Sequence, residues 1–288
     1  MNFEQKLKSG KFVITAEVSP PRGVDVSSFI EKTLLLKNRI DAVNVTDFQN
    51  VGVRITSLVG SYLLLREGFE PIFQITARDR NRVAISGELL SAYALGIRNV
   101  LVLTGDYTTT GIVKSAKPVF DLDATNILVI AKKLEEGEDF SGKKLNKSPD
   151  FFLGAVFNPN LVPLEIEILK LLKKKKAGAE FFQTQLFFEL SLMERVRDRV
   201  GDDVKIIAGV TIFKSLEMLE YMMDNVPGIK IPERVIEMFK NTKDIKALSI
   251  EFCVEFCSKL KESKLLDGIH FLASRPSDII KVLDLLKW

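Results

Sequence analysis

Short apolar segments alternate with longer amphipathic segments along almost the whole chain. The short segments are rich in β-branched and aromatic residues, which is typical of buried strands, whereas the longer ones repeat their apolar residues with helical spacing. Eight strands are predicted, over residues 12–18, 42–45, 71–76, 99–104, 151–157, 181–186, 205–210 and 268–273. Helices are predicted over residues 28–38, 55–67, 80–95, 123–136, 162–177, 191–200, 214–225 and 277–286, with two additional ones at 232–240 and 245–263.

The order of these elements predicts the fold class. Strict alternation of strand and helix indicates parallel strands, because each crossover helix returns the chain to the same edge. Eight such units predict a closed (β/α)8 barrel, a TIM barrel, formed as a single domain over residues 1–288 with extra helices before the last strand. An open doubly wound sheet is the alternative, but no strand is followed by the Gly-x-Gly-x-x-Gly pattern of dinucleotide-binding domains.

Composition and charge narrow the function classes. Hydrophobic residues make up 46% and charged residues 27%, as in ordinary folded enzymes, and the net charge of +3 gives no reason to expect nucleic-acid binding. We expect a cytoplasmic location, because residues 1–8 lack the apolar core of a signal peptide and no uncharged stretch is long enough to span a membrane. Cys253, Cys257 and His270 are too few for a closed zinc site, so no metal is expected.

Hydrogen-bonding residues gather at the carboxyl ends of the predicted strands, where barrel enzymes carry their active sites. Glu17 is the most informative of them, because it ends a buried strand and a lone buried carboxylate is costly unless it is paired or protonated. His270, the only histidine, lies inside a strand, and no Ser-His-Asp or Cys-His system can be assembled without it. Glu17 is therefore the leading candidate for acid–base chemistry.

Other polar segments have both a structural and a functional interpretation. Gln183 and Gln185 share one strand face, so they either pair as buried amides or bind a ligand. Gly105 with Asp106 is either a common turn or a place where the backbone approaches a ligand whose N–H groups the aspartate accepts. The segment 78–82 is either a capped helix start or a phosphate-binding loop, and the lysine run at 173–176 suits a solvated helix end.

Taken together, several segments resemble the methylenetetrahydrofolate reductase family. They occur in the family's order at residues 16–21, 44–46, 74–76, 78–81, 96–100, 104–106, 177–179, 183–185 and 270–271. The family fold is the barrel predicted above. The resemblance implies an oxidoreductase of one-carbon metabolism and methionine biosynthesis, which reduces methylenetetrahydrofolate to 5-methyltetrahydrofolate by hydride transfer from a reduced flavin.

The resemblance also implies roles for individual residues. Glu17 would be the general acid that opens the methylene-bridged ring, Asp106 would accept the pterin N–H groups beside the flavin, and Gln185 would contact substrate in both half-reactions. Further substrate contacts are implied at Gln183 and Arg275. Flavin contacts are implied at Thr46, Asp47, Gln74, Thr104, Gly105, Asp106, Phe120, Phe157, Lys173 and Lys174.

The cofactor and the partners follow from the same resemblance. FAD is the implied cofactor, with FMN as the alternative, and NADH or NADPH is the implied electron donor, with a partner subunit as the alternative source. The family tends to form homo-oligomers. Two other functions stay open: a flavin-binding electron-relay subunit of a larger complex, and another flavin-dependent barrel oxidoreductase of the proline-dehydrogenase kind.

Overall fold

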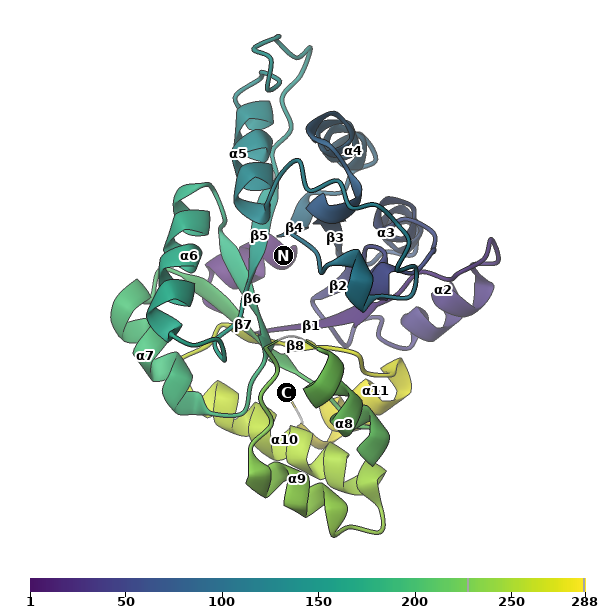
Figure 1. The fold of residues 1–288 in the computed structure, drawn as a ribbon, viewed down its shortest axis with the longest axis vertical. Coiled ribbons are helices and arrows are strands. Elements are labelled where there is room, and N and C mark those ends of the chain that lie inside the picture. The colour runs from purple at the N-terminus through teal and green to yellow at the C-terminus, as the bar shows by residue number, and fades with distance from the viewer. Residues whose placement is uncertain (227, 287) are drawn as a thin grey trace.

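Eight parallel strands form a closed barrel (Figure 1). The computed structural model describes residues 1–288 apart from Pro227 and Lys287. The strands are β1 (Val13–Val18), β2 (Ala42–Val45), β3 (Pro71–Thr76), β4 (Asn99–Leu103), β5 (Phe152–Phe157), β6 (Phe181–Leu186), β7 (Lys205–Val210) and β8 (Gly268–Phe271). Each strand pairs with its neighbours in the sequence, and β8 pairs with β1. The predicted fold class is confirmed, and every predicted strand overlaps an observed one.

Helices cover the outside of the barrel in the predicted order (Figure 1). They are α2 (Ser27–Leu34), α3 (Ser57–Arg66), α4 (Arg82–Ala94), α5 (Ala124–Glu135), α6 (Leu164–Lys176), α7 (Leu190–Val200), α8 (Leu216–Asn225) and α11 (Pro276–Leu286). The two additional helices, α9 (Glu233–Lys240) and α10 (Ile245–Ser263), precede β8 and pack with α8 around a second apolar cluster. Within the described part of the chain, none of the helices is long and apolar enough to cross a membrane.

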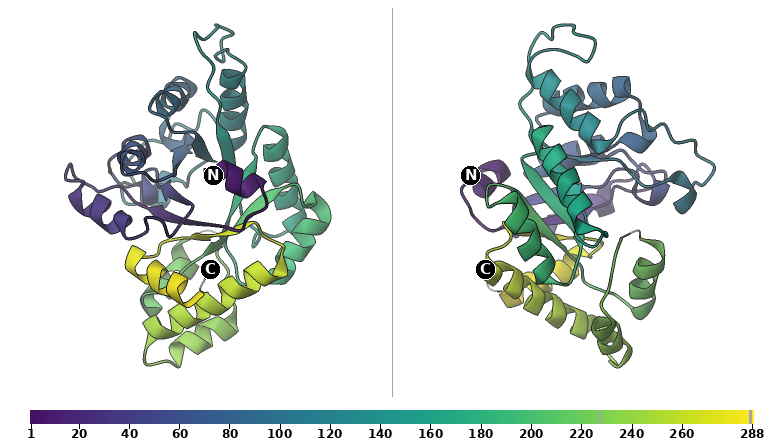
Figure 2. Two further views of the ribbon diagram at one scale, coloured as in Figure 1. Left: turned by 180° about the vertical axis from the view of Figure 1, so that it is seen from behind. Right: turned by 60° about the vertical axis from the view of Figure 1, so that its left-hand side comes forward.

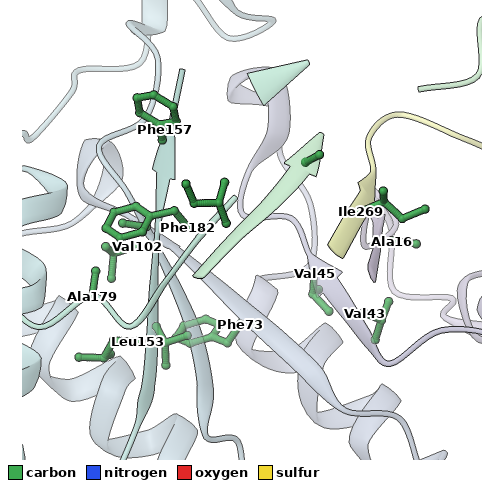
Figure 3. Packing of buried hydrophobic residues seen from close by; sticks show 14 of the residues in the cluster. Ala16, Val43, Val45, Phe73, Val102, Leu153, Phe157, Ala179, Phe182 and Ile269 are labelled. Carbon is green, nitrogen blue, oxygen red and sulfur yellow. The ribbon is translucent and has the colours of Figure 1, made fainter. Parts of the chain in front are cut away.

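Alternate residues of each strand face either the helices or the barrel interior. Ala16, Val43 and Phe73 belong to the core between barrel and helices (Figure 3). Val13 belongs to a separate cluster inside the barrel. Because Glu17 lies an even number of residues from Val13 along β1, its side chain faces the interior.

The amino-terminal segment closes one end of the barrel. It forms helix α1 (Phe3–Lys8), which the sequence pattern did not predict, because a segment with only two buried residues is too short to show a helical period. The Phe3 ring packs edge-on against Phe152 and Phe181, with ring centroids 5.8 and 5.6 Å apart. The strands begin at this end, so their carboxyl ends open at the other, where the loop after β4 and helix α8 project (Figure 2).

Removal of the Phe3 ring tests whether α1 fills the barrel. We expect Phe3→Ala to lower the free energy of unfolding by about 3–5 kcal/mol, since it leaves a cavity among buried aromatic rings. Urea unfolding followed by circular dichroism would measure the loss. The matched control is Val24→Ala, because the Val24 side chain is 96% exposed. Equal stability of the two variants would show that α1 does not contribute to the core.

Candidate active site

Glu17 is held at the carboxyl end of β1 by the loop that follows β8. Its Oε1 accepts a hydrogen bond from the backbone N–H of Ala273 at 2.9 Å. Ala273 has a φ of 49°, a left-handed conformation that is costly for a residue with a Cβ and is often found at functional sites. Burial raises the pKa of Glu17, and this effect outweighs the opposing effect of the Ala273 N–H. Glu17 therefore keeps its proton to a higher pH than an exposed glutamate does.

Glu17 opens into a pocket of about 480 Å³. The pocket lies between helix α2 and the loops after β1, β7 and β8, and Ser19, Gln49, Lys214 and Arg275 are among its lining residues. The structure thus brings the predicted general acid and the predicted substrate residue Arg275 into one cavity. Lys214 was not predicted as a site residue. Its position four residues after the end of β7 could have indicated one, because the loops after the strands form the mouth of the barrel.

A layer of uncharged polar side chains crosses the barrel interior beneath Glu17. Asn44 Nδ2 donates to Gln183 Oε1 at 2.7 Å, and Gln183 Nε2 donates to Asn44 Oδ1 at 3.1 Å. Thr15 Oγ1 lies 2.8 Å from His270 Nδ1, and burial lowers the pKa of His270 to about 3, which keeps the ring neutral. Gln183 is only 2% exposed and its amide is paired, so the expectation that it contacts substrate is corrected in favour of the buried-amide alternative.

Three predicted residues lie between this layer and the mouth. Gln185 follows Gln183 on the same face of β6, and its half-buried side chain accepts the N–H of Leu186 at 3.1 Å. The Thr46 hydroxyl donates to Ser19 at 2.9 Å. The Gln74 side chain is only 7% exposed, and its amide forms no hydrogen bond with any other described residue. Because this amide is not used by another described residue, Gln74 is suited to bind a polar ligand.

The loop after β4 contributes Thr104, Gly105 and Asp106 to the rim. Gly105 has a φ of 89°, and a Cβ there would clash with the side chains of Thr76 and Arg78. The glycine is thus required by close packing between the loops after β3 and β4, not by the approach of a ligand. The Thr104 hydroxyl accepts the first N–H of α5 at 3.1 Å, whereas Asp106 is exposed.

An aromatic pair lies further along the same loop. The Phe120 ring packs edge-on against the exposed Tyr107, with the ring centroids 5.7 Å apart. Tyr107 directly follows Asp106, so the pair and the carboxylate belong to one loop surface. Tyr107 was not predicted as a site residue, and its place next to the Gly-Asp turn was the only signal for it in the sequence.

Asp47 does not face a ligand. Its buried carboxylate forms an ion pair with Arg80 at 2.6 Å and accepts the Thr76 N–H at 3.0 Å, while Arg80 also pairs with Glu88 at 2.8 Å. The carboxylate is thereby fully used inside the protein, and the expectation that Asp47 contacts the flavin is corrected. For the segment 78–82, this favours the interpretation as a helix start over that as a phosphate-binding loop, because Arg80 is already bound within this buried network.

Three other implied flavin contacts lie on β5 and α6. Phe157 is buried in the core between the barrel and its helices (Figure 3). Lys173 and Lys174 are in the last turn of α6. Lys174 Nζ donates to the Val156 carbonyl at 2.7 Å, and burial lowers its pKa. The flavin-contact expectation is therefore corrected for Phe157, whereas for Lys173 and Lys174 it stays a prediction.

The two cysteines and the histidine lie on opposite sides of the sheet. The Sγ atoms of Cys253 and Cys257 on α10 are 3.9 Å apart and belong to the core outside the barrel, whereas His270 faces the interior. Over the residues that the structure describes, no group of three His, Cys, Asp or Glu side chains is placed to hold a metal ion.

Comparison with known protein families gives one match over nearly the whole chain. The model of a family described as methylenetetrahydrofolate reductase matches residues 2–285. A protein of Caenorhabditis elegans named probable methylenetetrahydrofolate reductase (NADPH) is 26% identical over 98% of this chain, which spans 43% of that protein. The 5,10-methylenetetrahydrofolate reductase of Escherichia coli K12 is 26% identical over 82% of this chain and 76% of its own length.

A solved structure shares the fold. A protein from Clostridium thermocellum, described as binding two copies of 5-methyl-5,6,7,8-tetrahydrofolic acid, aligns with a TM-score of 0.68. The alignment covers 99% of this chain and 98% of that protein, at 18% sequence identity. At this identity the likeness establishes the fold alone.

A substitution at Asp47 tests whether this residue stabilises the fold or binds the flavin. We expect Asp47→Asn to lower the free energy of unfolding by about 3–5 kcal/mol, because it leaves the buried Arg80 charge without its carboxylate. Chemical denaturation would measure the change. Asp121→Asn is the control, since Asp121 pairs with the exposed Arg82 and its loss should change stability little. An Asp47→Asn variant that is as stable as the control but binds flavin weakly would restore the ligand role.

Proposed function

Because this chain belongs to the methylenetetrahydrofolate reductase family, we propose that it reduces methylenetetrahydrofolate to 5-methyltetrahydrofolate with a flavin as the hydride carrier. The observation that carries the proposal is Glu17, a half-buried acid with a raised pKa that shares a pocket with Arg275. The name of the Clostridium thermocellum protein, which has the same fold, supports a folate as the ligand.

The residues at the mouth fit a flavin. Gln74 offers an unpaired amide inside the mouth, which suits the polar edge of an isoalloxazine ring. Thr46 and Thr104 add hydroxyl groups at neighbouring strand ends, and the loop after β4 adds the Tyr107 and Phe120 rings. When bound, a flavin would supply the hydride. We propose FAD with a nicotinamide donor, NADH or NADPH, and FMN is the alternative.

Glu17 supplies the proton that the reaction needs. Its half-buried carboxyl keeps a proton, and the Ala273 N–H fixes one of its oxygens, so the other oxygen is free to donate to a bridging nitrogen of the folate. Once this nitrogen is protonated, its bond to the methylene carbon breaks and the ring opens. The methylene carbon then forms an iminium with the other bridging nitrogen and can accept hydride. Asp106 would accept N–H groups of the pterin, and Gln185 would orient the substrate above the polar layer.

Exchange of the Glu17 carboxyl for an amide separates the two half-reactions. We expect Glu17→Gln to keep its flavin and the reduction of that flavin by the donor, while folate-dependent reoxidation falls by about 10²–10⁴-fold. Stopped-flow absorbance of the flavin would follow each step. Glu31→Gln is the matched control, because Glu31 is an exposed glutamate on α2 that does not line the pocket. Equal loss in both half-reactions would assign Glu17 a structural role.

The raised pKa of Glu17 also predicts a pH dependence. The protonated acid is the active form, so folate-dependent reoxidation should be fast below the pKa of Glu17 and fall as the pH rises through it. Single-turnover rates between about pH 5 and about pH 9 would define this limb. This fall in rate with rising pH should be absent in Glu17→Gln, because the amide that replaces the carboxyl does not titrate. A wild-type rate that rises with pH over this range would contradict the assignment.

A further inference from the structure

Two cations in the Glu17 pocket have no carboxylate partner. Lys214 lies in the loop after β7 and Arg275 in the loop after β8, and both line the pocket. Neither side chain forms an ion pair or a hydrogen bond with another residue in the described part of the chain. Asp278, the acidic residue closest to Arg275 in the sequence, is paired with Lys246 at 2.9 Å.

The two positive charges are close enough to affect each other. Burial is the main cause that lowers the pKa of Lys214, and the charge of Arg275 lowers it further, against a smaller opposing effect of Asp278. Two like charges at one pocket repel each other, and because both side chains are exposed, water weakens this repulsion without removing it. An anionic group placed between them would remove this repulsion and gain charge-assisted hydrogen bonds.

The acidic residues of the pocket do not supply that anion. Glu17 accepts the Ala273 N–H, and burial raises its pKa, which disfavours its charged form. The Asp25 carboxylate accepts the N–H of Ser27 at the start of α2 at 2.9 Å. Lys32 on α2 adds a third cation to the lining, so the pocket beyond Glu17 is positive.

We propose that Lys214 is a specificity-determining residue which, together with Arg275, binds the carboxylate tail of the folate. This inference rests on the proposed function, since it places the reacting ring at Glu17. A ring at Glu17 directs the tail of the same molecule along the pocket toward the two cations. The pocket would then select reduced pterins that carry a negatively charged tail over otherwise identical pterins without one.

Binding of the reaction product, with and without its tail, tests the proposal. The probes are 5-methyltetrahydrofolate and its analogue that lacks the glutamyl group, titrated calorimetrically into the flavin-loaded protein. We expect Lys214→Met to weaken binding of 5-methyltetrahydrofolate about tenfold, the loss of one charge-assisted hydrogen bond, and to leave binding of the analogue unchanged. Lys214→Arg should retain the tail preference, because it keeps the positive charge.

Lys240→Met is the control, because Lys240 is an exposed lysine at the end of α9 that lies outside the pocket. Equal weakening of both ligands by Lys214→Met, or no weakening of either, would overturn the proposal. A wild-type protein that binds both ligands equally well would exclude the tail contact while the proposed function stands. A flavin-loaded wild-type protein that binds neither ligand would overturn the proposed function and this inference together.

Discussion

The pairing of β1 with β8 is the constraint on which the rest of the structure depends. It joins Val13 to Gly268 and Thr15 to His270 and so closes the sheet between the two ends of the chain. A side chain at position 268 would clash with the Val13 backbone, so the closure requires a glycine there. The same pairing carries the loop after β8 over β1, which gives Glu17 its N–H donor and places Arg275 in its pocket.

The barrel interior changes in polarity from the closed end to the mouth. Aromatic and aliphatic side chains fill the end beneath α1, uncharged amides and hydroxyl groups follow in the middle, and ionisable groups stand at the mouth. The polar middle layer can lie next to the apolar layer because its amide and hydroxyl groups form hydrogen bonds with one another across the barrel. A charged group is therefore tolerated only near the carboxyl end of β1, where Glu17 is the last strand residue that faces the interior.

The strands, the outer helices and the barrel could be predicted because each depends on a local period that the sequence displays. The location of Glu17 at the mouth followed from the same pattern. The role of Asp47 could not be predicted, and the two interpretations of Gln183 could not be separated. Their partners Arg80 and Asn44 are 33 and 139 residues away, and local pattern does not indicate side-chain pairing over such distances. Nor was α1 predicted, because its six residues are too few to show a helical period, although Asn2 and Gln5 form a capping box at its start.

The closed end of the barrel also holds both described ends of the chain (Figure 2). Helix α1 lies across it, and the Trp288 ring packs edge-on against Phe12 with the centroids 5.3 Å apart. Any polypeptide joined to either end, whether a further domain or an affinity tag, would start on the far side of the molecule from Glu17. An affinity tag at either end therefore has its point of attachment away from the mouth through which ligands reach the rim.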